Sequence, residues 1–456
     1  MERLTEKERK EKIKKSLKYS ILDGSFYAAM VGFGESFFSA FAVFLKATNT
    51  QLGLLGTLPQ TLGSLSQLFS NRLIRFFSSR KRFVLAGVLL EALVFIPIAL
   101  VFFFGTLRVF HLIFFVCLYW VLGMIIVPAW SSWMGDLVDE KKRGDYFGRR
   151  NRITGMIMLI TFLLGGYVLQ SYADGTTRQY AGFLMIFGIA MLARFVSFIY
   201  LAKKYEPEYR IVKKDPFTFM EFVKKASHRN YGLFVIFLCF MNFAVYVATP
   251  FFSAYMLYDL KFSYMTYAII SAIAVLVKYL SMPAWGRASD RYGTKKVMTL
   301  ASYLMPLVPL LWVFSRDVYF LVFVQIYSGF TWAGFEITTF NFIFDTTTPE
   351  KRATCVSYYN VLNGIFIFLG GIMGSIILKY NHILSSQYYS IFILSFGLRY
   401  ITSFHFIPKL KEVRQVQHIS YKKLLTHIIS STPNMGHVQH LLPLHGKKGK
   451  MGRSRL

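Results

Sequence analysis

The sequence predicts an all-α integral membrane protein whose twelve transmembrane helices form two pseudo-symmetric six-helix bundles. Composition indicates a membrane protein, because 54% of the 456 residues are hydrophobic, only 16% are charged, and the charges lie in short stretches between long apolar runs. A repeat indicates two bundles, because residues 136–169 are echoed 209 positions downstream. Both copies contain the end of an apolar run, an acid, a basic turn and the start of a glycine-bearing run.

Twelve apolar runs, each about 20 residues long or more, define the expected helices. Lipid offers the backbone no hydrogen-bond partner, and a β-barrel would show alternation over about ten residues instead. The runs therefore predict helices rather than strands. They cover residues 20–45, 51–74, 83–104, 109–134, 151–171, 180–202, 232–258, 263–285, 297–314, 318–344, 354–378 and 387–407.

The apolar runs and the charge runs together divide the chain into five parts. The N-terminal arm precedes an apolar run of about 25 residues that has no small-residue cleavage site, so we expect that run to stay in the protein. The basic tail is low in order-promoting patterns, and we expect it to be mostly disordered. The parts are a basic arm (1–19), a first six-helix bundle (20–202), a basic linker (203–230), a second six-helix bundle (231–407) and the basic tail (408–456).

The positions of the basic residues predict the orientation in the membrane. The net charge is +29, and 43 of the 52 Lys and Arg lie in the arm, the tail and the loops on their side. By the positive-inside rule, both termini are expected in the cytoplasm of an inner or plasma membrane. The same distribution favours contact with an anionic inner leaflet over nucleic-acid binding. The loops of the other side carry one basic residue each: Lys46, Arg108, Arg178, Lys261, Arg316 and Lys379.

The sequence contains no feature that predicts an enzyme. Its three cysteines, Cys117, Cys239 and Cys355, lie in or beside apolar runs without disulfide or metal spacing. It has no nucleophile motif, and no Walker-type phosphate loop that would indicate ATP-driven transport. We therefore expect no catalytic residue, no metal and no cofactor. We also expect the protein to function as a monomer.

Two cytoplasmic turns carry a family resemblance. The turn between the eighth and ninth runs contains Gly286, Ser289, Asp290, Arg291, Tyr292, Gly293, Lys295 and Lys296. This turn resembles the loop signature of the major facilitator superfamily, and the twelve runs fit that resemblance over residues 18–407. The turn after the fourth run contains Pro128, Trp130, Trp133, Asp136, Arg143, Gly144, Tyr146, Phe147, Gly148 and Arg149. It resembles a group of poorly characterised bacterial permeases within that superfamily.

The resemblance implies a gate at the cytoplasmic turns. Asp290 is expected to accept hydrogen bonds at the start of the fifth helix, where the helix dipole is positive. The alternative is a plain solvated turn, and ion pairs at these turns are as readily structural as gating. In the first half Arg80 and Lys81 match Lys295 and Lys296, but Arg75 stands where Asp290 would. The gate candidates are Asp290, Arg291, Lys295, Arg149, Arg150 and the repeated pairs Asp136/Arg143 and Asp345/Arg352.

Three charges within apolar runs are candidates for solute or proton binding. Glu35 lies in the first run, Lys278 in the eighth, and Glu336 in the tenth near Trp332. Each charge costs about 2.5–3.5 kcal/mol in lipid, so it should line a cavity or find a partner. By resemblance, the first, fourth, seventh and tenth helices line the central cavity. Desolvation favours the neutral form of a carboxyl group, which would let Glu35 or Glu336 carry a proton, whereas a buried Glu–Lys pair could be purely structural.

The repeat helps to choose among these charges. Lys278 corresponds to Gly63 and Glu336 to Val127, so the shared scaffold demands neither. Asn242 and Tyr246, one turn apart before a proline in the seventh run, add polar groups that serve either ligand contact or helix packing.

Other charges in the apolar runs are interpreted as structural. Glu91 lies in a run that is peripheral in the family, and Asp23 and Asp259 lie at run ends, where we expect water. Arg194 and Arg399 correspond to each other and are expected to be snorkelling or scaffold residues.

The function predicted from the sequence is secondary active transport of a small solute by alternating access, with a proton as the coupling ion. One alternative is a drug or cation efflux antiporter, although the Gly-Pro pair common late in the fifth helix of such antiporters is missing after Gly165 and Gly166. Another is a membrane receptor or scaffold that keeps the fold without transport.

Overall fold

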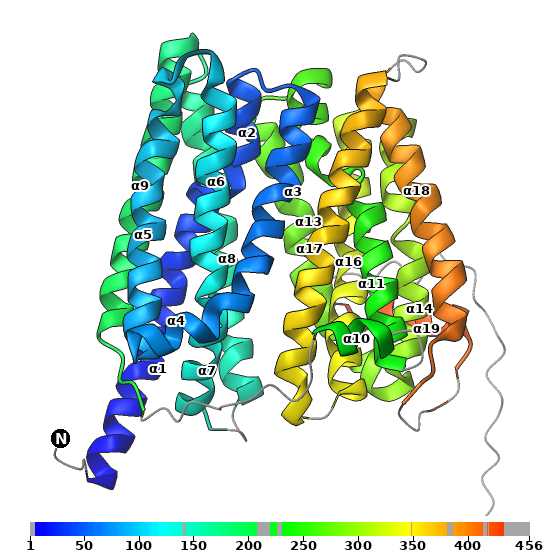
Figure 1. Ribbon diagram of the computed structural model, residues 1–456. Helices are drawn as coiled ribbons and strands as arrows, with labels where there is room; N and C mark the ends of the chain where they lie inside the picture. Colours follow the sequence, from blue (N-terminus) through cyan, green and yellow to red (C-terminus); the bar gives the residue numbers. More distant parts are fainter. Residues whose placement is uncertain are drawn as a thin grey trace, which may run out of the picture.

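The computed structural model describes residues 5–139, 143–207, 219–225, 230–347, 349–380, 386–413, 417 and 419–432, and these residues are helical wherever they form regular structure. Figure 1 shows two groups of roughly parallel helices side by side, one from each half of the chain. This arrangement confirms the all-α membrane fold with two six-helix halves.

The first half contains the expected runs in order, with several helices interrupted. Its elements are α1 (Glu6–Phe33), η1 (Glu35–Phe37), α2 (Phe38–Phe44), α3 (Asn49–Ser66), η2 (Gln67–Phe69), α4 (Ser70–Phe77), α5 (Arg80–Leu100), η3 (Val101–Phe103), η4 (Gly105–Leu107), α6 (Arg108–Ile125), α7 (Val127–Leu137), α8 (Arg143–Ser171) and α9 (Thr176–Ala202).

The second half follows the same plan and ends in one additional helix. Its elements are α10 (Phe219–Lys225), α11 (Asn230–Tyr246), η7 (Thr249–Phe251), α12 (Phe252–Ala254), η8 (Tyr255–Asp259), α13 (Tyr264–Tyr292), α14 (Thr294–Leu304), α15 (Leu307–Phe314), α16 (Val318–Thr346), α17 (Pro349–Tyr380), α18 (Gln387–Phe406), η9 (Ile407–Lys409) and α19 (Tyr421–Ser431).

Eleven helical segments of the described chain are long and apolar enough to cross a membrane. The remaining expected span, 51–74, is helical as α3, η2 and α4, but it is more polar because it packs between the two halves. Thr61 Oγ1 donates a hydrogen bond of 2.6 Å to the Gly364 carbonyl oxygen of α17. A Cβ at Gly364 would collide with Ser64, so α3 and α17 approach as closely as small residues permit.

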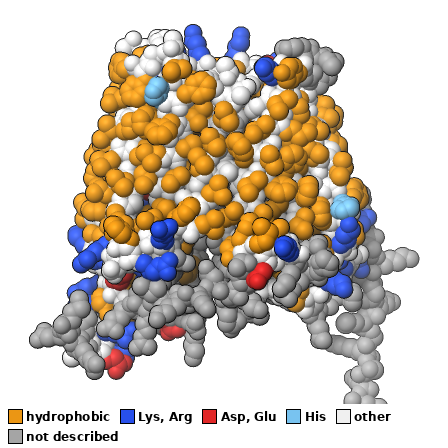
Figure 2. Space-filling model, viewed as in Figure 1, with side chains coloured by type: hydrophobic (Ala, Val, Ile, Leu, Met, Phe, Trp, Pro, Cys, Tyr) orange, Lys and Arg blue, Asp and Glu red, His pale blue; other side chains and the backbone are white. Residues whose placement is uncertain are grey.

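Charge marks one end of the molecule. Figure 2 shows a wide apolar belt, with Lys and Arg gathered mainly at the lower end. We call this the basic end; the start of α1, the α4–α5 turn, the α13–α14 turn and α19 all lie there (Figure 1). The other end is called the opposite end.

The opposite end holds the two halves together. The Tyr258 hydroxyl donates a hydrogen bond of 2.5 Å to the Val43 carbonyl oxygen, and the Asn49 amide donates one of 3.2 Å to Gln387. A polar recess of about 470 Å³ lies beside these contacts, with Asp259 and Tyr388 also in its lining. These contacts join the corner after the first span to the ends of the seventh and twelfth spans.

Candidate functional site

The first and seventh spans both change helical form near their middles. α1 ends at Phe33 and gives way to the 3₁₀ segment that begins at Glu35. α11 ends at Tyr246, and a 3₁₀ segment begins at Thr249. A mid-helix 3₁₀ stretch often marks a functional hinge, and interrupted membrane helices expose backbone polar groups to ligands. The two breaks are equivalent, but only the first one carries an acid.

Glu35 is half-buried at the first break and is bound by one tyrosine. The Tyr119 hydroxyl of α6 donates a hydrogen bond of 2.8 Å to Glu35 Oε2. Tyr119 is 2% exposed, and it packs against Phe38 and Phe95 in the apolar core. The structure therefore links Glu35 to the fourth span within the first half, while the other two predicted charges lie together in the second half.

Lys278 and Glu336 form an ion pair between α13 and α16. Lys278 Nζ lies 2.9 Å from Glu336 Oε2, and the two side chains are 24% and 52% exposed. Tyr327 of α16 donates a hydrogen bond to the Leu304 carbonyl oxygen of α14. Glu336 lies nine residues further along, or two and a half helical turns, so it projects from the face opposite α14. Trp332, one turn before Glu336, packs edge-on against Phe335 of the same helix.

Asn242 and Tyr246 of α11 bind two different neighbours. The Asn242 amide donates a hydrogen bond of 2.7 Å to Asn363 Oδ1 of α17. The Tyr246 hydroxyl donates one of 2.8 Å to Gln60 Oε1 of α3. The second contact crosses between the halves. Gln60 was not among the predicted site residues, although an amide within an apolar run is a signal that could have identified it.

The repeated acids at the basic end bind the start of a helix in each half. Arg80 Nη1, on the first residue of α5, lies 2.7 Å from Asp136 Oδ2. Thr294 Oγ1, on the first residue of α14, donates a hydrogen bond of 2.7 Å to Asp345 Oδ2. The side chains of Arg143 and Arg352, predicted as partners, lie outside the described residues.

A second pair of carboxylates caps the same two helices. Glu206 accepts a hydrogen bond of 3.2 Å from the Lys81 backbone nitrogen, and Glu412 accepts one of 2.8 Å from that of Lys295. Carboxylates are favourable there because the first turn of a helix has unpaired N–H groups and a positive dipole. These contacts correct the sequence alignment: Lys81 matches Lys295, and Arg80 matches Thr294.

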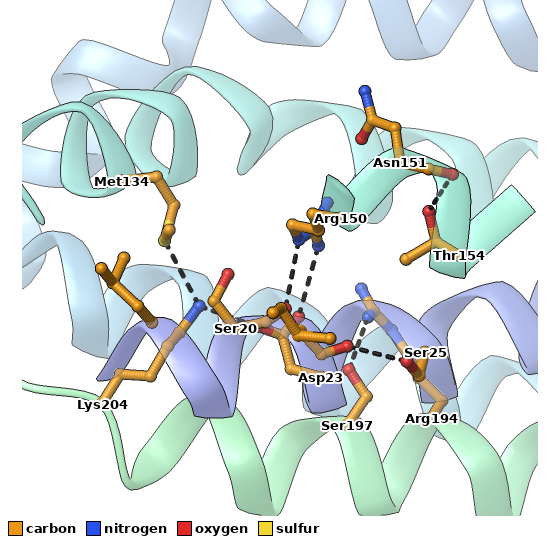
Figure 3. A network of polar contacts seen from close by, with 12 residues as sticks. Ser20, Asp23, Ser25, Met134, Arg150, Asn151, Thr154, Arg194, Ser197 and Lys204 are labelled. Atoms are coloured by element: carbon orange, nitrogen blue, oxygen red, sulfur yellow. Dashed lines mark hydrogen bonds and ion pairs between the residues drawn. The ribbon is translucent and has the colours of Figure 1, made fainter. Parts of the chain in front are cut away.

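Arg150 binds the first helix. Figure 3 shows Arg150 and Lys204 converging on Asp23 from α8 and from the end of α9. Lys204 Nζ lies 2.8 Å from Asp23 Oδ2, and the nearest Arg150 nitrogen lies 3.9 Å from Asp23 Oδ1. Arg150 Nε also donates a hydrogen bond of 3.1 Å to the Ser20 carbonyl oxygen. Arg150 was expected near Asp290; the structure directs it into its own half.

Asp23 is not near water, contrary to expectation. It is 3% exposed, and Lys204 is 1% exposed. The Lys204 ammonium lies 5.0 Å from the centre of the Trp133 ring, and the Arg150 guanidinium lies 4.9 Å from that of Trp130. Burial lowers the pKa of Lys204, and the Asp23 carboxylate opposes that shift. This arrangement ties α1, α7, α8 and α9 together at the basic end.

Three other gate candidates are exposed: Arg149 on α8, and Asp290 and Arg291 in the last turn of α13. Arg291 Nε donates a hydrogen bond of 3.2 Å to Gln417 of the tail. Leu424 and Ile428 of α19 are fully buried, and α19 packs on α13 and α14. No helix was predicted in the tail, although the i, i+4 spacing of these two apolar residues is a helical signal.

Comparisons with known proteins fit this geometry. The family model of the Major Facilitator Superfamily matches residues 24–253 and 232–420. The fold resembles that of a POT family peptide transporter in an auto-inhibited form (11% identity, 89% of this chain, 98% of that chain, TM-score 0.68). It also resembles that of a D-xylose-proton symporter (11% identity, 89% of this chain, 99% of that chain, TM-score 0.66). A third similar structure is that of the nucleoside transporter NupG (16% identity, 88% of this chain, 99% of that chain, TM-score 0.61).

One curated relative matches only locally. The efflux pump azaK of Aspergillus niger is 30% identical over 106 residues, which is 23% of this chain and 22% of the relative. The family match extends over most of the chain and confirms the resemblance drawn from the loop signature. The chain belongs to the Major Facilitator Superfamily and is a multi-pass membrane transporter of the secondary kind.

Proposed function

We propose that the protein moves a small solute by alternating access and couples this movement to a proton carried by Glu35. The observation that carries the proposal is the position of Glu35 at the break in the first span, bound by Tyr119. A carboxyl group at this depth is tolerated when it is neutral, hydrogen-bonded or in contact with a water-filled path. The equivalent break in the seventh span has Thr249 instead, so the acid is not part of the shared scaffold.

The solute is proposed to contact the second half. Lys278 and Glu336 are partly exposed at membrane depth, and contact with lipid would cost each of them about 2.5–3.5 kcal/mol. A water-filled cavity beside α13 and α16 would remove that cost and would leave both charges available to a ligand. Asn242, Tyr246 and Gln60 supply hydrogen-bonding groups at the contact of α11, α17 and α3.

The basic end is proposed to face the cytoplasm, with the protein in the inner or plasma membrane. The asymmetry of Lys and Arg supports this orientation. The α13–α14 turn, with Asp290, Arg291 and Lys295, then forms part of the cytoplasmic gate. The hydrogen bonds from Tyr258 to Val43 and from Asn49 to Gln387 close the other side.

The test begins with a ligand screen by thermal stabilisation, because a ligand at about 100 times its Kd should stabilise the fold by about 2.7 kcal/mol. A stabilising solute is then added to proteoliposomes that contain a pH-sensitive dye and are held under a pH gradient. We expect solute-dependent proton flux that Glu35→Gln abolishes. A proton flux that survives Glu35→Gln would contradict the assignment to Glu35, and one that survives neutralisation of both Glu35 and Glu336 would contradict coupling through either acid.

A second candidate function is proton-driven efflux. The local similarity to an efflux pump favours it, and Glu35 and Glu336 would then also bind a cationic solute. Inverting the pH gradient in the same liposomes separates the two: an exporter concentrates the solute on the acidic side of the membrane, and a symporter on the alkaline side. Absence of flux with every stabilising ligand would favour a receptor or scaffold.

A further inference from the structure

Each half of the protein buries one arginine in its sixth span. Arg194 of α9 is 5% exposed and Arg399 of α18 is 2% exposed. They occupy equivalent places, because Glu206 follows Arg194 by twelve residues and Glu412 follows Arg399 by thirteen, and each glutamate caps the third helix of its half. Neither arginine snorkels to the basic end.

The arginine of the first half is fully compensated. Arg194 Nε donates a hydrogen bond of 3.0 Å to Glu91 Oε2, and Arg194 Nη2 binds the same oxygen. Arg194 Nη1 donates to Ser197 Oγ at 3.2 Å, and the guanidinium lies 4.8 Å from the centre of the Tyr27 ring. Glu91 is itself 2% exposed. This is a buried, hydrogen-bonded ion pair.

The arginine of the second half has no carboxylate beside it among the described residues. Arg399 Nε donates a hydrogen bond of 3.1 Å to Ser395 Oγ, which itself donates to the Ala244 carbonyl oxygen. Arg399 Nη1 is buried without a hydrogen-bond partner in the described part of the chain. The position equivalent to Glu91, eleven residues from the start of the third helix of the half, is Met305.

The packing places Met305 at the level of Arg399. Ser403 Oγ of α18 donates a hydrogen bond of 2.9 Å to the Ser302 carbonyl oxygen. α14 leads away from the basic end and α18 leads toward it. Therefore Met305, three residues after Ser302, and Arg399, one turn before Ser403, both lie on the far side of that contact. The Ser302 hydroxyl is also fully buried, with no partner among the described residues.

We propose that Arg399 binds a small inorganic anion, such as chloride, within the second half. A guanidinium stays protonated in proteins, so it cannot lose its charge on burial. An uncompensated charge at this depth is costly, and an anion beside Nη1 would supply the charge that Glu91 supplies to Arg194. Ser395 and Ser302 are fully buried, so the occupant must be small. This inference is independent of the proton-coupled transport proposed above.

The test compares the melting temperature of the purified full chain in chloride and in gluconate at equal ionic strength. We expect a saturable rise with chloride for the wild type, and a similar rise with bromide. Arg399→Met should remove the difference between the salts. Equal melting temperatures for the wild type in the two salts would overturn the proposal, because water or packing would then accommodate the guanidinium. A chloride effect that persists in Arg399→Met would also overturn it.

Two reciprocal variants exchange the features of the halves. Met305→Glu gives Arg399 the carboxylate that Arg194 has, so it should raise the melting temperature in gluconate and remove the chloride effect. Glu91→Met gives Arg194 the surroundings of Arg399, so it should lower the melting temperature in gluconate and add a second chloride-dependent rise. If Arg399→Met fails to fold, Met305→Glu decides: loss of the chloride effect supports the site, and an unchanged effect contradicts it.

Discussion

The two halves share a backbone plan but differ in where they bury charge. Both interrupt their first span with a 3₁₀ segment, at Glu35 and Thr249. Both turn the following corner at a lysine with positive φ, Lys46 (62°) and Lys261 (54°). These shared features lie at breaks, corners and caps, which set the helix directions, so the repeat conserves geometry rather than chemistry.

The differences lie at three equivalent positions. The first half has Glu35, Arg80 and Glu91, and the second has Thr249, Thr294 and Met305 at the same places. The Lys278–Glu336 pair reverses the pattern, because it occurs only in the second half. Since the scaffold folds with either kind of residue, each charge must be explained by a local partner or by function.

The largest expected effect comes from the acid at the first break. Glu35→Gln should reduce solute-coupled proton flux to the level of empty liposomes, because the amide keeps the Tyr119 hydrogen bond but carries no titratable proton. The matched control is Thr249→Val at the equivalent break, which should keep flux near that of the wild type. Proteoliposome flux, normalised to the amount of folded protein, measures both. Equal losses in the two variants would mean that the breaks matter for geometry alone.

The next effect concerns the buried pair of the first half. Arg194→Met should destabilise the protein by about 3–5 kcal/mol, because it leaves Glu91 charged, buried and unpaired. The double variant Glu91→Met/Arg194→Met removes both charges and should recover most of that loss. Reversible unfolding in detergent measures the two free energies. If the double variant were as unstable as the single one, packing of the Arg194 stem rather than charge would explain the loss.

The sequence predicted the elements of this fold well because apolar length is a local property. All twelve runs are helical, and the shared Asp136 and Asp345 both bind the start of a third helix. The partners of the charged residues were harder to predict, because they depend on how helices that are distant in the sequence pack together. Glu35 and Tyr119 are 84 residues apart, and no periodic pattern connects them. Asp23 resembled a residue at the membrane surface because its partner Lys204 looked like part of a loop.

A smaller loss of stability is expected from variants at the first residues of α5 and α14, at the basic end, and the loss should differ between the two halves. Arg80→Met should cost about 1.5–3 kcal/mol, the usual range for hydrogen bonds to charged groups, because Asp136 loses a partner that is itself fully buried. Thr294→Val in the second half should cost less, near the lower end of that range at about 1.5 kcal/mol, because the donor that the Asp345 carboxylate loses is an uncharged hydroxyl. Thermal unfolding of the two variants side by side measures the difference. A larger loss for Thr294→Val would reverse the comparison between the halves.

The smallest effect on stability is expected where the second half carries its own charge pair. Lys278 and Glu336 are 24% and 52% exposed, and pairs with that degree of exposure contribute about 0–1 kcal/mol. Lys278→Met/Glu336→Gln should therefore unfold within about 1 kcal/mol of the wild type. By the corrected alignment, Lys278 is equivalent to Ser64 in the first half, and Glu336 is equivalent to Val127, so the scaffold accepts uncharged residues at both places. Solute transport by the same variant should nevertheless fall, because both charges are proposed to contact the ligand. Unchanged solute affinity together with lost stability would make the pair a structural link between α13 and α16, and the functional charge of the protein would then lie in the first half alone.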